Sequence, residues 1–217
     1  MAKKPTRTIT MAATKGGVGK TTLSTALAVR AAERGHTVAL IDRDPQESLG
    51  GWFDRRGNAK GLKLFDVDST AEAVGLIQAE GFDWLIIDTP PAMLSLIEDA
   101  IAQTDLVIIP TRASALDLLA VDPVIDLCRE HGKPYAFLIN SADPRQKLTK
   151  TAVQYLSAHG RVFDTIVAQR VAYVAAMTNG KGPTEVDKTD ATSSELDALW
   201  GEIDKMISAA ARKKARA

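Results

Sequence analysis

TKGGVGKTT (residues 14–22) stands between an apolar, strand-like run at residues 9–13 and an Ala- and Leu-rich segment of helical character. Its three glycines allow the backbone to turn its N–H groups inward, and with the helix N-terminus behind them these groups form a nest for an anion. In such a loop Lys20 is expected to bring positive charge to the β- and γ-phosphates of a nucleotide, and Thr21 a hydroxyl to Mg²⁺. The stretch therefore predicts a strand, a phosphate-binding loop and a helix.

Length and composition set the limits for the rest of the chain. A chain of 217 residues with 45% hydrophobic and 25% charged residues predicts one soluble α/β domain, residues 1–217, with a substantial core. Because the formal net charge is zero, any binding to nucleic acid depends on local patches rather than on overall charge.

The single cysteine, Cys128, excludes a disulfide framework and fits a reducing cytoplasm. No apolar run approaches the roughly 20 residues that a membrane span needs. The first residues, MAKKPTRTITMAA, have no usable apolar region for a signal peptide. We therefore expect a cytoplasmic protein with no membrane partner.

Strand-like and helix-like patterns alternate along the chain. This alternation predicts a doubly wound, mostly parallel sheet with helices on both faces. The expected strands are residues 9–13, 37–41, 62–67 (at or near the sheet edge), 82–88, 106–110 and 135–139. The expected helices are residues 21–34, 70–80, 117–131 (which Pro123 kinks or restarts), 147–158 and 194–210, and residues 178–193 are expected to be a polar loop.

Three carboxylates fall where strands are expected to end. DRDPQ (residues 42–46) places Asp42 and Asp44 after one strand, and the apolar run FDWLIID (residues 82–88) ends at Asp88. Ligands of open α/β sheets bind at the carboxyl ends of the strands, so these acids are well placed for a metal or a water. Asp-Pro pairs also mark ordinary turns, and many buried strands end in an acid, so each motif alone leaves both readings open.

Together these motifs resemble the ParA/MinD family. KGGVGKTT resembles its deviant Walker A box, with Thr14 where the generic phosphate loop has glycine. DRDPQ is similar to the family's switch I, and DTPP (residues 88–91) to its switch II. The resemblance covers residues 7–210 and implies a P-loop NTPase fold.

The resemblance also implies roles for individual residues. Lys15 would reach the phosphates of a second subunit, and Asp44 would orient or activate the attacking water. Asp42 would hold the water shell of Mg²⁺, Asp88 would bind Mg²⁺ through water, and Thr21 would ligate it. The implied catalytic residues are Lys15, Lys20 and Asp44, and the implied nucleotide-binding residues are Lys15, Gly16, Gly17, Val18, Gly19, Lys20, Thr21, Thr22 and Asn140.

Three further segments belong to this resemblance. In the family an asparagine at the position of Asn140 hydrogen-bonds the adenine edge, but Ser141 replaces the basic residue that usually follows it. Residues 111–117, after the strand expected at 106–110, resemble the family's P-x-x-S-x-x-D loop and equally fit a loop with a helix cap at Asp117. Residues 169–173, QRVAY, match a Q-R-x-A-Y sequence motif that ParA-type proteins often carry.

The function that the resemblance implies is an ATP hydrolase of weak intrinsic activity, with ATP and Mg²⁺ as its cofactors. Relatives of this small ParA type form a homodimer on binding ATP and bind DNA without sequence preference. A ParB-like activator protein bound to the cargo stimulates hydrolysis and releases the dimer. The implied location is the cytoplasm in association with the nucleoid, and plasmid, chromosome, carboxysome and chemoreceptor cargoes remain open.

Basic residues gather at the two ends of the chain. A short basic arm at residues 1–7 precedes the phosphate loop, and a basic tail occupies residues 211–217. Such a tail is either simply solvated or binds a polyanion, and in a dimer two tails could form a salt-sensitive DNA surface. The candidate DNA-binding residues are Arg161, Arg170, Arg212, Lys213 and Lys214.

Three other classes compete with this interpretation. A MinD-like membrane switch needs bulky apolar residues opposite its basic face, and the tail offers mostly alanine. An iron–sulfur reductase of the nitrogenase iron-protein type needs two cysteines per subunit, and only Cys128 is present. A ligase similar to dethiobiotin synthetase does not explain Lys15 together with DRDPQ.

Overall fold

The structure, a computed structural model, describes residues 5–57, 59–187 and 189–214, apart from the side chains of residues 190, 213 and 214. Its strands are β1 Arg7–Met11, β2 Val38–Asp42, β3 Leu62–Phe65, β4 Trp84–Asp88, β5 Leu106–Thr111, β6 Tyr135–Ile139 and β7 Arg161–Val162. The helices are α1 Lys20–Glu33, α2 Ser48–Arg56, α3 Thr70–Glu80, α4 Leu94–Ala102, α5 Ala115–Leu118, α6 Asp122–Glu130, α7 Lys147–Ser157, α8 Val171–Thr178, α9 Pro183–Val186 and α10 Asp190–Lys214.

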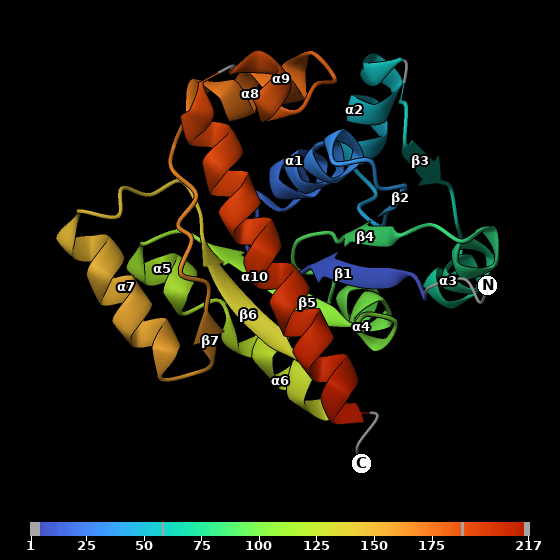
Figure 1. Ribbon diagram of the computed structural model, residues 1–217. Coiled ribbons are helices and arrows are strands. Elements are labelled where there is room, and N and C mark those ends of the chain that lie inside the picture. Colours follow the sequence, from blue (N-terminus) through green and yellow to red (C-terminus); the bar gives the residue numbers. More distant parts are fainter. Residues whose placement is uncertain (1–4, 58, 188, 215–217) are drawn as a thin grey trace.

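The strands form one sheet in the order β3-β2-β4-β1-β5-β6-β7, and every pair is parallel (Figure 1). The strand order reverses beside β1, because the chain first places β2 and β3 on one side of β1 and later places β5, β6 and β7 on the other side. This is the switch point at which open α/β sheets bind ligands. The doubly wound parallel sheet is confirmed, and β3 lies at the edge as its sequence predicted.

Alternate side chains of each strand enter different cores, because successive Cβ atoms of a strand point to opposite faces. In β5, Leu106 and Ile108 join the core beneath α1, α2 and α10, whereas Val107 and Ile109 join the core beneath α4, α6 and α7. Both sets are buried, which explains why β5 is almost wholly apolar rather than alternating. Helices thus cover both faces, as Figure 1 shows for α10 and α1 in front of the sheet.

The segment predicted as one helix over residues 117–131 is two helices, α5 and α6. Ser114 caps α5 by accepting a hydrogen bond from the backbone N–H of Asp117. The helix cap that the sequence left open for this segment therefore lies at Ser114 and not at Asp117. Pro123 then lies in the first turn of α6, where its missing N–H costs no hydrogen bond. Of the two effects left open for Pro123, restarting the helix is the one observed.

The polar stretch at residues 178–193 is more ordered than the predicted loop. It contains α9, and α10 begins at Asp190 and runs to Lys214, well beyond the expected residues 194–210. The two basic ends of the chain are described only in part. Arg7 belongs to β1, ion-pairs with Asp204 and lies over the ring of Trp84, while residues 1–4 and 215–217 lie outside the described part.

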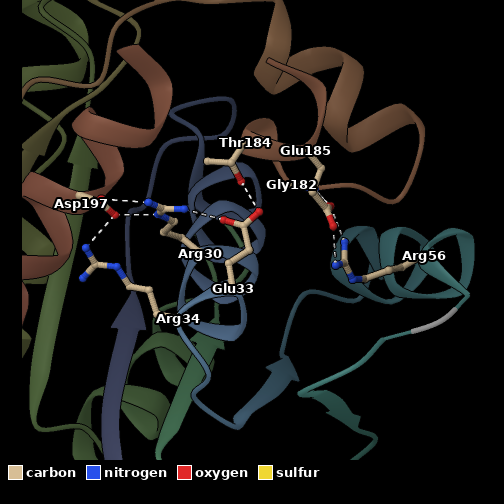
Figure 2. Close-up of polar contacts among 8 residues, drawn as sticks. All are labelled: Arg30, Glu33, Arg34, Arg56, Gly182, Thr184, Glu185 and Asp197. Atoms are coloured by element: carbon tan, nitrogen blue, oxygen red, sulfur yellow. Dashed lines mark hydrogen bonds and ion pairs between the residues drawn. The ribbon is translucent and has the colours of Figure 1, made fainter. Parts of the chain in front are cut away.

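Polar contacts fasten α9 to α1 and α2, as Figure 2 shows. Arg56 at the end of α2 makes two hydrogen bonds to the Glu185 carboxylate, 2.9 and 3.0 Å long, and Glu185 also accepts the N–H of Gly182 at 2.6 Å. On the α1 side, the hydroxyl of Thr184 donates to Glu33 at 2.9 Å.

The same side of α1 is fixed to α10 through one carboxylate. Asp197 accepts two hydrogen bonds from Arg30, 2.6 and 2.8 Å long, and ion-pairs with Arg34 at 2.9 Å (Figure 2). The Arg30 guanidinium lowers the pKa of Asp197. Gly182, at the N-cap of α9, permits the close approach of α9 to α1, because an added Cβ there would stand 2.4 Å from Cγ1 of Val29.

A substitution at Gly180 tests the packing of the α8–α9 turn against α2. Gly180 has φ +64°, and an added Cβ would lie 2.3 Å from the backbone nitrogen of Arg56. We expect Gly180→Ala to lower the free energy of unfolding by about 1–3 kcal/mol, because the obstacle is backbone. Gly201→Ala in α10 is the matched control, since nothing lies within 4 Å of its added Cβ. It should raise stability by about 1 kcal/mol in the same urea titration, and equal effects of the two changes would contradict the packing described.

Candidate functional site

The loop between β1 and α1 is held by the end of β6. The Nδ2 of Asn140 donates a 2.7 Å hydrogen bond to the carbonyl of Val18. Gly19 has φ +101°, and a Cβ there would lie 2.1 Å from the same amide nitrogen. Gly17 also adopts a positive φ, +74°. Glycine is therefore required at position 19 on two counts, the backbone angle and the contact with Asn140.

The two lysines of the loop differ in environment. Lys20 is 7% exposed, and its Nζ donates to the backbone carbonyl of Lys15 at 3.2 Å, so that the ammonium lies beneath the loop. Burial lowers the pKa of Lys20, while attraction to Asp88 and Asp44 opposes that shift. The Lys15 side chain is exposed. One loop thus presents one cation inward and one outward.

Asp88 ends the buried strand β4 and faces the first turns of α1. It is 0% exposed and accepts hydrogen bonds from the hydroxyls of Thr21 at 2.6 Å and Ser24 at 3.0 Å. Burial raises the pKa of Asp88 to about 7, helped by the charge of Asp42 and opposed by the two hydroxyls and by Lys20. Ser24 was not anticipated from the sequence, although its place three residues after Thr21 puts both hydroxyls on one side of α1.

Asp42 has a structural role that the sequence did not reveal. Its carboxylate accepts the backbone N–H groups of Leu49 at 2.9 Å and Gly50 at 3.0 Å, and so caps the N-terminus of α2. Its other oxygen accepts the N–H of Asp44 at 3.0 Å. Burial raises the pKa of Asp42, while these backbone donors oppose the shift.

Asp44 lies beyond Asp42, at the edge of a cavity of about 410 Å³. One carboxylate oxygen accepts the N–H of Gln46 at 3.0 Å. The cavity is lined by Gly16, Gly17, Gly19, Lys20, Thr21, Thr22, Asp44, Ser48, Pro91, Arg112, Asn140, Ser141, Ala168, Gln169, Arg170, Tyr173 and Val174. Of the predicted nucleotide residues, Val18 and Lys15 lie outside this lining, the first buried and the second exposed.

The wall opposite the loop comes from the QRVAY segment, which the sequence marked without assigning it to this cavity. Arg170, a candidate for DNA binding, lines the cavity and makes a 3.4 Å ion pair with Glu195. The Tyr173 hydroxyl donates a 2.9 Å hydrogen bond to the same carboxylate. Burial is the largest of the causes that raise the pKa of Tyr173. Sequence could not join α8 to the loop, because about 150 residues separate them and only the sheet brings them together.

The other candidate DNA residues lie elsewhere. Arg161 is exposed at the start of the edge strand β7, and Arg212 is exposed near the end of α10. The side chains of Lys213 and Lys214 lie outside the described residues. Of these candidates, Arg170 is the one that lines the cavity beside the glycine loop.

The oxygen donors near the loop fit a magnesium ion held mainly by a nucleotide. Among the described residues no cluster of three or more His, Cys, Asp or Glu side chains could hold a metal alone. The Thr21 hydroxyl and the Asp88 carboxylate are nevertheless hard oxygen ligands beside the glycine loop. Mg²⁺ usually keeps several waters and adds one or two protein oxygens to those of a phosphate, which matches this sparse set.

The parallel sheet, its switch point and the glycine loop at the end of β1 define the class of P-loop nucleotide-binding proteins. Residues 9–184 match the model of the CobQ/CobB/MinD/ParA nucleotide binding domain, and the chain belongs to this family.

Relatives within the family agree with this assignment. The "Maintenance of carboxysome distribution protein A" of Halothiobacillus neapolitanus is 30% identical over 94% of this chain and 99% of its own length. The "Chromosome-partitioning ATPase Soj" of Thermus thermophilus is 26% identical over 83% of this chain and 88% of its own. A crystal structure of a plasmid partition protein from Borrelia burgdorferi shares the fold, with a TM-score of 0.72 and 20% identity over 93% of this chain and 100% of that one.

Two features bear on the competing classes. Cys128 is fully buried in α6, where burial raises the pKa of its thiol to about 12, so it serves as a small core residue. Within residues 5–57, 59–187 and 189–214, no helix is both long and apolar enough to span a bilayer.

The raised pKa of Asp88 predicts a pH dependence of stability. Between about pH 4 and pH 7 the folded protein keeps a proton on Asp88 that the unfolded chain has lost, so the free energy of unfolding falls as the pH rises. Asp88→Asn removes this contribution. Its stability relative to wild type should therefore increase across that interval, by up to about 4 kcal/mol.

Urea titrations at several pH values, without nucleotide or divalent cations, measure this difference. Asp126→Asn, at an exposed position of α6, is the control and should follow the wild-type pH profile. Parallel profiles for Asp88→Asn and wild type would contradict the assignment of the shifted pKa to Asp88.

Proposed function

We propose that this chain is an ATP-dependent partition or positioning ATPase of the ParA type. ATP with Mg²⁺ binds each monomer, and two monomers close face to face over two nucleotides. The dimer binds DNA without sequence preference until a ParB-like activator on the cargo stimulates hydrolysis. The single observation that carries this proposal is the opposed placement of the two loop lysines, Lys20 buried beneath the loop and Lys15 exposed outside it.

The loop offers the donors that a triphosphate needs. Its backbone N–H groups and the N-terminus of α1 would bind phosphate oxygens, and Lys20 would exchange the carbonyl of Lys15 for a phosphate oxygen. Thr21 and Asp88 would hold Mg²⁺, directly and through water respectively, with Asp42 near its water shell. Bound Mg²⁺ would neutralise charge on the phosphates. Asn140, already bonded to Val18, lies in the cavity wall where the adenine edge would be recognised.

The hydrolytic step asks mainly for positioning and charge compensation. Asp44 lines the cavity on the side of the loop, and its carboxylate is fixed by the N–H of Gln46. It would orient the attacking water there. Lys15 would cross to the phosphates of the second subunit, where a further cation stabilises charge that develops in the transition state.

Substituting each lysine separates these two roles. Lys15→Ala should still bind ATP, because the inward donors remain, but should no longer dimerise with ATP. Lys20→Ala should lose nucleotide binding by at least about tenfold, because a charge-assisted contact to phosphate is removed.

Nucleotide affinity by fluorescence titration and dimer mass by light scattering provide the two measurements. Lys181→Ala, at an exposed site in the α8–α9 turn, is the control and should bind and dimerise as wild type. An ATP-dependent dimer formed by Lys15→Ala would refute the role of Lys15.

The proposed DNA contacts are Arg161 and Arg212, which are exposed, and Lys213 and Lys214 in the same basic tail. The described apolar side chains of α10, among them Leu199, Ile203 and Ile207, are packed into the core. They leave no apolar face for a membrane along the described part of α10, which favours DNA over a lipid surface. The two named relatives act in carboxysome distribution and chromosome partitioning, which supports a positioning role for this chain.

Binding to random-sequence DNA tests the proposal directly. We expect binding with ATP and little with ADP or without nucleotide, weakening steeply between two salt concentrations because phosphate contacts release counterions. Asp44→Ala should remain in the ATP-bound, DNA-binding form, because it hydrolyses ATP slowly. DNA binding that is absent or independent of ATP, or wild-type turnover by Asp44→Ala, would overturn the proposal.

A further inference from the structure

A second groove of about 680 Å³ adjoins the nucleotide cavity. It runs between the segment after β5, the turn that leads into α7 and the linker before α8. The two hollows share one wall, formed by Arg112, Ser141 and residues 168–170. In Figure 1 the α7 and α5 helices lie together on the side of the sheet that carries β6 and β7. The proposed ATPase cycle assigns nothing to this groove.

The N-terminus of α7 opens into the groove. Gln146 occupies its N-cap position without a side-chain hydrogen bond, and the first turn carries no acid. The backbone N–H of Lys150 donates to the carbonyl of Gln146. The backbone N–H groups of Leu148 and Thr149 bond to no residue that the structure describes. Unpaired N–H groups and the helix dipole make such an end attractive to an anion.

The Thr149 side chain supplies an independent indication of a ligand. Thr149 is 1% exposed, lines the groove, and its hydroxyl has no hydrogen-bond partner among the described residues. Other buried threonines bond to protein, as Thr10 does to the carbonyl of Ala100 and Thr89 to that of Met11. A buried hydroxyl without a partner is uncommon and indicates a missing partner.

The charges around this hydroxyl favour an anion. The side chain of Arg112 is exposed and pairs with no described residue, and among the described residues the Nε of Arg170 is buried without a partner. Arg145 also lines the groove but is bonded to Asp143, the acid in this lining. The Arg145 side chain lowers the pKa of Asp143, so that pair carries little net charge. Because Arg170 is ion-paired with Glu195, the guanidinium of Arg112 is the charge that leaves the groove positive.

We propose that the groove at the N-terminus of α7 is a second phosphate site, which takes the terminal phosphate group of a small phosphomonoester or orthophosphate itself. The Thr149 hydroxyl and the N–H groups of Leu148 and Thr149 donate to its oxygens, and Arg112 compensates its charge. A terminal phosphate offers three free oxygens to these converging donors, one more than a phosphodiester. The proposal goes beyond the ATPase function and does not depend on it.

Backbone amide resonances locate the two phosphate sites separately. In a titration of the full chain with potassium phosphate, against potassium chloride at equal ionic strength, Leu148 and Thr149 report the α7 site. Gly17 and Gly19 report the loop. We expect saturable shifts of Leu148 and Thr149 with phosphate and none with chloride. A response of the loop glycines alone would overturn this proposal and leave the ATPase proposal intact. A response of Leu148 and Thr149 alone would support this proposal and contradict the ATPase proposal.

Thr149→Val keeps the shape of the side chain and removes only the hydroxyl. It should weaken phosphate binding at α7 by about tenfold, the effect of a hydrogen bond to a charged group, and leave the loop response unchanged. Arg112→Gln should weaken it about threefold, as expected for an exposed charge. Arg129→Gln on α6 is exposed in the same way and should have no effect. An unchanged affinity of Thr149→Val would overturn the assignment.

Two further measurements complete the test. In phosphate-free buffer Thr149→Val should melt no lower than wild type, because the hydroxyl has no partner among the residues that the structure describes. A clear loss of stability would contradict the proposal. Glycerol 3-phosphate should bind at α7 as orthophosphate does, or better if a phosphomonoester is the natural source. Shifts produced only by an oligonucleotide with a 5′-hydroxyl would show that the groove takes a nucleic-acid backbone, which would overturn it.

Discussion

The rest of the site depends on one buried carboxylate. Asp88 ends β4 between β2 and β1, is wholly removed from solvent, and bonds to the Thr21 and Ser24 hydroxyls of α1. These contacts fix the first turn of α1 over the strand ends and so fix the glycine loop that precedes it. Burying a carboxylate is costly unless donors compensate, and the raised pKa of Asp88 shows that two hydroxyls compensate it only in part.

A second carboxylate links the loop region to the outer helices. Asp42 caps the N-terminus of α2, and Arg56 lies at the other end of this helix. Arg56 donates two hydrogen bonds to Glu185 in α9. The α8 helix that precedes α9 forms the far wall of the nucleotide cavity. The residues after β2 are therefore connected to α9 through α2 and its contact with Glu185.

The two hollows near the loop follow the same physical rule. Each lies at a helix N-terminus, where the first backbone N–H groups have no partner within the helix, and each is bordered by cations. At α1 the glycines of the loop supply additional backbone donors, whereas at α7 a buried threonine hydroxyl does so. Arg112 and Arg170 line both hollows, so a charge bound in one of them changes the field in the other.

The sequence by itself determined the parallel sheet, the phosphate loop and the acids at the strand ends, because apolar runs and glycine spacing are local properties of the chain. It could not resolve residues 115–130 into two helices or find α9, since Ser, Asp and Pro suit caps and loops alike. Only the tertiary structure showed Asp42 as a helix cap, brought Arg170 to the cavity and left the Thr149 hydroxyl without a partner in the described part of the chain. Hydrogen bonding and burial depend on residues far apart in the chain, and only folding brings those residues together.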